Sequence, residues 1–135
     1  MANKMKAELV ISGGSDFEPG HLELAIGLAP DSICRIGETI GRSVRTHDSN
    51  LWILSTGYSD CHSLTTCLAP LFARLEPFWE RLHVAIPPVA QVQLSVAVYI
   101  DESAPELNLE RDAVGRLAAL GASIDIDVIL TGGKE

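Results

Sequence analysis

Hydrophobic and polar positions alternate along two segments in the C-terminal third of the chain. The apolar positions of residues 91–101 and 122–130 recur at every second place: Val92, Leu94, Val96, Val98 and Ile100 in the first, and Ile124, Ile126, Val128 and Leu130 in the second. Successive side chains of a β-strand point to opposite faces, so each segment predicts a strand with one face in the core. The other face carries Tyr99, Asp125 and Asp127 and is expected to be at least partly wet. Such a face is a surface on which a partner could bind.

Two further strands are predicted at residues 7–12 and 51–55. The second of these is apolar on both faces, which is typical of a central strand that is covered on both sides. Residues 47–50 favour a turn before it, because Asp, Ser and Asn side chains satisfy nearby backbone groups. We therefore expect a hairpin in which a weak strand at residues 42–46 precedes residues 51–55, and an irregular segment over residues 31–41.

Apolar residues at intervals of three and four predict three helices, over residues 18–29, 60–82 and 108–120. Pro70 and Pro77 fall inside the second helix, so we expect a kink there or a division into two shorter helices. Residues suited to the helix ends are Asp60 and Asn108 at two N-termini and Gly121 after the last C-terminus.

The resulting order is strand, helix, strand, strand, helix, strand, helix, strand. Its first six elements match the βαββαβ order of ferredoxin-like domains, and a C-terminal helix–strand unit follows. One-sided strands favour two layers, with helices on one face of a mainly antiparallel sheet. We therefore predict an α+β fold of this kind, formed by a single domain over residues 1–135 with frayed ends at 1–5 and 131–135.

Charge and composition disfavour several classes of function. The chain has 10 Lys and Arg against 18 Asp and Glu, a formal net charge of −8, which disfavours binding to nucleic acid or to anionic membranes. The N-terminus lacks the apolar stretch of a secretory signal, and no apolar run approaches the ~20 residues that cross a bilayer. Three cysteines, an odd number, suit reduced thiols. We expect a cytoplasmic protein.

Candidate metal-binding groups lack the spacing that metal sites need. Thiols and imidazoles are concentrated at Cys61, His62, Cys67 and His83, without the short paired gaps of a zinc site. Asp125 and Asp127 project from one face of a strand, but they lack the shaped loop of a calcium site. These two acids are either solvated or form a patch for a basic partner, and we expect no metal site.

Candidate catalytic groups are equally isolated. His47 adjoins Asp48 in a predicted turn, and no nucleophile motif accompanies the pair. Residues 13–15, Gly-Gly-Ser, follow a strand and precede a helix, but they lack the Lys of a P-loop and the third Gly of a dinucleotide-binding loop. We therefore expect no catalytic residue and no cofactor.

Several short motifs occur together along the chain. They are LVISG at residues 9–13, EP at 18–19, GLAP at 27–30, RIGE at 35–38, LW at 51–52, LEP at 75–77 and LAALGASIDID at 117–127. In this combination the chain resembles a bacterial family of small single-domain proteins that is described only as a domain of unknown function. The resemblance implies no particular activity. In size and acidity such proteins are similar to immunity proteins, which neutralise bacterial toxins.

Two hypotheses of function follow. The first is a non-catalytic protein-binding module that holds a protein partner, such as a basic toxin domain, at Trp52, Tyr99, Asp125 and Asp127, or that forms a homodimer through the same face. The alternative is a small-molecule-binding domain or enzyme. Its site would lie between residues 31–41 and the sheet, where Arg35, Glu38 and Trp52 could hold a carboxylate or a planar ligand.

Overall fold

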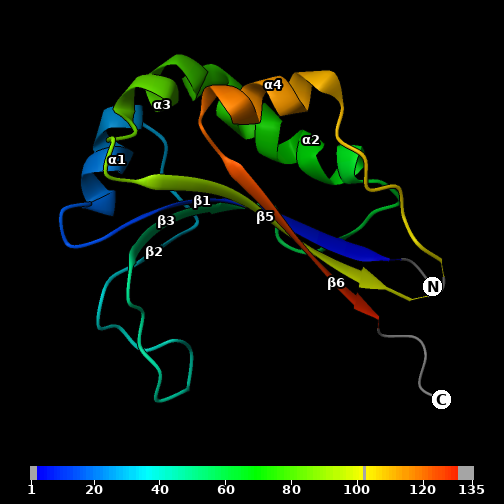
Figure 1. Ribbon diagram of the computed structural model, residues 1–135, viewed down its shortest axis with the longest axis horizontal. Helices are drawn as coiled ribbons and strands as arrows, with labels where there is room; N and C mark the ends of the chain where they lie inside the picture. Colours follow the sequence, from blue (N-terminus) through cyan, green and yellow to red (C-terminus); the bar gives the residue numbers. More distant parts are fainter. Residues whose placement is uncertain (1–2, 102, 131–135) are drawn as a thin grey trace.

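The computed structural model describes residues 3–101 and 103–130. It shows an α+β fold, in which helices lie across one face of a mostly antiparallel six-stranded sheet (Figure 1). In chain order the elements are β1 (Lys4–Gly13), α1 (Pro19–Ile26), β2 (Ser32–Cys34), β3 (Asn50–Ser55), β4 (Ser59–Asp60), α2 (Leu64–Leu75), the 3₁₀ turn η1 (Glu76–Phe78), α3 (Trp79–Ala85), β5 (Gln91–Ile100), α4 (Arg111–Ala119) and β6 (Ser123–Leu130).

The sheet is built around β1. Its strands lie in the order β2-β3-β1-β5-β6, and the short β4 pairs with the beginning of β1. The pairs β2–β3, β3–β1 and β1–β5 are antiparallel, whereas β6 runs parallel to β5 after the α4 crossover. The last strand is therefore at one edge of the sheet, and β2 is at the other.

The core lies between the helices and one face of the three middle strands. Its sheet side consists of alternate residues: Met5, Ala7, Leu9 and Ile11 of β1, Trp52 and Leu54 of β3, and Val92, Leu94, Val96 and Val98 of β5. These β5 residues confirm the face predicted from the alternation. The helix side includes the α2 stripe Leu64, Leu68, Leu71 and Leu75.

The predicted break in the long helix is confirmed. Pro77 lies in η1, which separates α2 from α3, while Pro70 is accommodated inside α2. The predicted N-cap of this helix is wrong. Ser63 caps α2 by accepting a hydrogen bond from the backbone N–H of Thr66 at 3.2 Å, whereas Asp60 lies in β4. A Ser side chain satisfies an N–H group that the helix itself leaves without a partner.

The predicted second strand is also wrong. The strand that pairs with β3 is Ser32–Cys34, and residues 37–47 form a separate arm closed by backbone hydrogen bonds such as Gly37 N–H to His47 O at 2.9 Å. The side chain of Val44, near the tip of this arm, is 97% exposed. Residues 42–46 have no apolar face to bury, so they are not held in the sheet.

The prediction of a frayed N-terminus is wrong for residues 3–5. Lys4 and Met5 belong to β1, and Met5 is fully buried. Asn3 is buried too, and its amide has partners there: it donates to Ser103 O at 2.7 Å and accepts from the N–H of Asp101 at 2.9 Å. Residues 1–2 and the other predicted frayed segment, 131–135, lie outside the described residues.

The last strand differs from its prediction in one respect. The face of β6 that bears Ile124, Ile126, Val128 and Leu130 was expected in the core, but only Ile126 is partly buried. Ile124 is 41%, Val128 49% and Leu130 76% exposed. The helical layer covers β1 and β5, and β6 runs out from under it toward the C-terminus (Figure 1).

Candidate functional site

The structure brings together three of the four residues predicted to bind a partner. In the register between β5 and β6, Ala97 lies beside Asp127 and Tyr99 lies beside Ile129, while Asp125 is one pleat earlier on the same face. This face points away from the helices. We call the surface formed by Tyr58, Tyr99, Asp125, Asp127 and Ile129 the acidic face.

Tyr58 is the residue of this face that the sequence did not single out. Its ring contacts that of Tyr99 edge-on, with centroids 5.4 Å apart and planes inclined by 62°. A hydrogen bond with Tyr99, followed by partial burial, raises the pKa of the Tyr58 phenol. Lys6 Nζ lies 4.8 Å from the centroid of the Tyr58 ring. Tyr58 stands outside any alternating pattern, between β3 and β4, so only the fold reveals its position.

The carboxylates of the acidic face lack counter-ions within the described chain. Asp125 and Asp127 are exposed and take part in none of the ion pairs found among the described residues. The lysines of β1 have other acidic partners: Lys6, which also lies over the Tyr58 ring, is 3.6 Å from Glu8, and Lys4 is 2.7 Å from Asp60. The field of these two acids is therefore available to a charged partner.

The acidic face ends at an open strand edge. Among the described strands β6 pairs only with β5, so the hydrogen-bonding groups on its outer side are free of strand partners. Native proteins usually protect such edges, because an exposed edge is a template for another strand. In β6 the edge combines acids on one face with the exposed Ile124, Val128 and Leu130 on the other.

Trp52, the fourth predicted partner-binding residue, cannot take part. Its side chain is fully buried, because its β3 position lies opposite Ile11 and faces the helices. The indole Nε1–H is buried without a hydrogen-bond partner within the described part of the chain. Because both faces of this strand are apolar, the sequence could not decide on which side Trp52 lies. The fold places it on the core side.

The alternative site at residues 31–41 is not assembled. Arg35 Nη2 pairs with Glu18 Oε2 at 2.6 Å, and the Glu38 carboxylate accepts the backbone N–H of Arg35 at 2.7 Å. The guanidinium of Arg35 holds the pKa of Glu18 below its usual value. With Trp52 in the core, these side chains support the local chain rather than converge on a ligand.

The candidate metal ligands do not come together within the described residues. No group of three or more His, Cys, Asp or Glu residues within residues 3–101 and 103–130 could hold a metal ion. Cys61 and Cys67 are buried, and burial raises the pKa of the Cys67 thiol to about 12, which keeps it protonated and poorly nucleophilic. Across these same residues, every helix is too short or too polar to cross a membrane.

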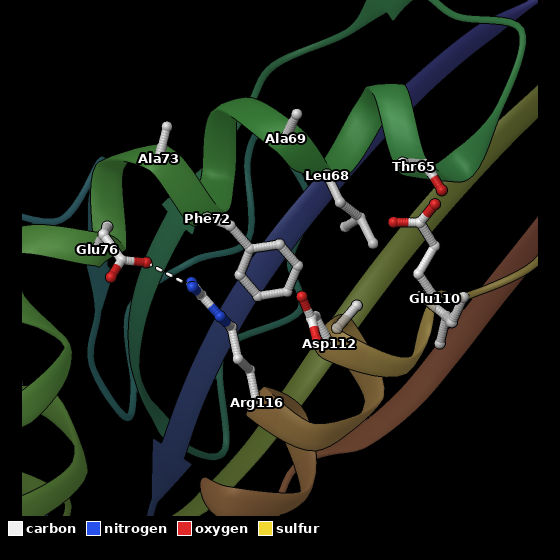
Figure 2. Close-up of a pocket in the computed structure, with 11 residues that line it drawn as sticks. Thr65, Leu68, Ala69, Phe72, Ala73, Glu76, Glu110, Asp112 and Arg116 are labelled. Atoms are coloured by element: carbon white, nitrogen blue, oxygen red, sulfur yellow. Dashed lines mark ion pairs between the residues drawn. The ribbon is translucent and has the colours of Figure 1, made fainter.

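A cavity lies on the helical side of the molecule. Between α2 and α4 there is a cavity of about 370 Å³. Figure 2 shows Leu68 and Phe72 reaching from α2 toward α4, with Glu110, Asp112 and Arg116 of the facing segment around them. This site was not predicted from the sequence. The sequence indicates it only weakly, because Phe72 and Ala113 look like ordinary members of the apolar faces of their helices.

The chain matches the family model described as "Domain of unknown function (DUF4279)" over residues 3–131. No curated protein and no solved structure matches it. The matched segment takes in every strand and helix, from β1 to β6. The chain therefore belongs to the DUF4279 family of domains of unknown function.

Proposed function

We propose that this protein is a non-catalytic binding module that holds a basic protein on its acidic face and the adjoining β6 edge. The observation that carries the proposal is the state of β6. It is an edge strand whose acids have no counter-ion among the described residues and whose apolar side chains are exposed. An apolar stripe, main-chain groups without a strand partner and unpaired charge occur together on this one strand. A bound partner would cover the stripe, hydrogen-bond to the main chain and neutralise the charge.

The geometry favours addition of a strand to β6. An extended segment of the partner would form main-chain hydrogen bonds along the edge and alternate its side chains between the two faces. Its Lys or Arg residues would meet Asp125 and Asp127, and its apolar residues would cover Val128 and Leu130. Tyr99, held by Tyr58, would be the aromatic anchor, since Tyr is enriched where binding energy concentrates.

A second copy of the chain suits β6 less well. An antiparallel β6–β6 pair centred on Ile126 would set Asp125 of one copy opposite Asp127 of the other. Like charges directly opposite each other destabilise a sheet. The net charge of −8 adds repulsion between two copies. The charge pattern therefore supports a basic partner over a homodimer.

A toxin domain is the class of basic partner that we propose, with neutralisation of the toxin as the role of the complex. The small size and acidity of the chain support this assignment.

We also propose that β1 to β5 form a ferredoxin-like core. The spatial order β2-β3-β1-β5, with every neighbouring pair antiparallel, supports it, and α4 with β6 extends that core by one parallel strand.

The proposal is tested by the kinetics of association with a basic partner purified on the immobilised protein. Replacing Asp125 and Asp127 by Lys should lower the association rate constant at least about tenfold at low salt and flatten its dependence on ionic strength. A matched double variant, Asp16→Lys with Asp48→Lys, makes the same change of charge near the opposite edge. Equal slowing by both variants, or none by the first, would sink the assignment of the acidic face.

A further inference from the structure

The helices α2 and α4 lie on one side of the sheet (Figure 1). The cavity between them is therefore on the other side of the sheet from the acidic face. It exists because α4 is attached to the body at few points: Leu117 is the buried residue of this helix. The wall from α2 presents Leu68 and Phe72 (Figure 2). The wall from α4 includes the small side chain of Ala113. Its volume of about 370 Å³ falls in the range of small-molecule sites.

Arg116 lines the cavity beside Phe72 and Glu76 (Figure 2). Its Nη2 lies 2.6 Å from Glu76 Oε1, and its guanidinium carbon lies 5.7 Å from the Phe72 ring centroid and 5.6 Å from that of Trp79. The ion pair and the two rings hold the guanidinium in place. The guanidinium already has a carboxylate partner in Glu76, so it is not left free to bind an anion in the cavity.

The mouth of the cavity is acidic. Glu110 and Asp112 line it, are exposed, and take part in none of the ion pairs found within the described residues. The Glu110 side chain does not cap α4 either, although its residue occupies the N-cap position. Two carboxylates without a counter-ion thus stand beside an apolar pocket, an arrangement complementary to a cation that carries hydrocarbon.

We propose that this cavity binds a small organic cation, with its apolar body against Leu68 and Phe72 and its ammonium group beside Glu110 and Asp112. Burial of the apolar body supplies most of the affinity, and the two carboxylates supply the selection for positive charge. This site is independent of the proposed function, because it shares no residue with the acidic face or with β6.

The test compares two probes of matched shape, 4-phenylbutylammonium and 4-phenylbutyrate, by calorimetry and by NMR titration of the whole chain. The ammonium should bind saturably, about fivefold or more tightly than the carboxylate, since attraction is replaced by repulsion at an exposed mouth. Its chemical-shift changes should centre on Leu68, Phe72 and Ala113. Equal affinity for the two probes, or changes centred elsewhere, would overturn the proposal.

Variants identify the groups responsible. Ala113→Leu should fill the cavity and abolish saturable binding, whereas Ala118→Leu, an exposed position of the same helix, should leave binding unchanged. Glu110→Gln with Asp112→Asn should reduce the preference for ammonium to about one, and Asp16→Asn with Asp48→Asn should preserve it.

Three further results would contradict the proposal. The first is retention of binding in a folded Ala113→Leu variant. The second is a preference for ammonium that survives the Gln and Asn substitutions. The third is a dimer that sediments in the native protein and is lost in Ala113→Leu, because a second copy would then occupy the cavity.

Discussion

At the scale of single residues, Trp52 and Tyr99 show how the side of a strand decides the role of an aromatic group. Both were expected to anchor a partner. Trp52 is fully buried against the helices, whereas Tyr99 is half-buried on the opposite face, in contact with Tyr58. The alternation predicted the side of Tyr99 because β5 has one polar face. It could not decide the side of Trp52, because both faces of β3 are apolar.

The burial of Trp52 predicts a large cost for its removal. Trp52→Ala should lower the free energy of unfolding by about 3–5 kcal/mol, because it leaves a cavity in the core. Denaturation by urea measures this. Tyr99→Ala, a truncation on the open face, should cost clearly less. A loss below about 1 kcal/mol in Trp52→Ala would contradict the placement of the indole in the core.

The Tyr58–Tyr99 contact predicts a shift in titration. Tyr99→Phe removes the hydrogen bond that is the largest cause of the raised pKa of Tyr58, so that pKa should fall toward its ordinary value. Absorbance of the phenolate in an alkaline titration measures it, with Tyr58→Phe to assign the signal. A Tyr58 pKa that does not move in Tyr99→Phe would show that the two hydroxyl groups do not interact.

The same contact gives a dependence of stability on pH. A raised pKa in the folded state means that the protonated phenol is favoured by folding. The contribution of Tyr58 is therefore complete below its unfolded pKa and is lost as the pH rises through its folded pKa. Alkaline unfolding should accordingly show a smaller pH dependence in Tyr99→Phe than in the native chain, when followed by circular dichroism. An identical dependence in both proteins would contradict this account.

At the scale of elements, the sequence predicted the long strands and helices and missed the short ones. β5 could be predicted because ten residues alternate without interruption, and the division of α2 from α3 could be predicted because proline lacks an N–H. β2 has three residues and no alternation to detect. Its place depends on tertiary contacts, such as the Asp31 N–H that donates to Ile53 O at 2.8 Å.

The capping of α2 makes a prediction at this scale. Ser63→Ala should lower the free energy of unfolding by about 1 kcal/mol, because the N–H of Thr66 loses its acceptor. Asp60→Ala, at the position that the sequence favoured as the cap, removes only an exposed ion pair with Lys4 and should cost less than about 0.5 kcal/mol. Thermal and urea denaturation of the two variants compare them directly. The reverse ranking would place the helix start at Asp60.

At the scale of the whole molecule, the helices shelter one face of the sheet and stop short of β6. The one-sided arrangement could be predicted, because β1 and β5 each have one apolar face. The exposure of β6 could not, because its sequence alternates just as that of β5 does. What differs is the extent of the helical layer, which depends on how α4 crosses the sheet (Figure 1). The cavity beside α4 was unpredictable for the same reason.

The proposed function requires the edge of β6, with its acids, to bind a basic extended segment. The most direct test is an NMR titration of the native chain with a peptide of alternating Lys and Val, beside the same peptide with Glu in place of Lys. We expect saturable shifts along Ser123–Leu130 and at Tyr99 with the Lys peptide alone, and we expect them to be lost when Asp125 and Asp127 are replaced by Lys. Equal binding of the Glu peptide, or shifts confined to the opposite edge at Ser32–Cys34, would contradict it.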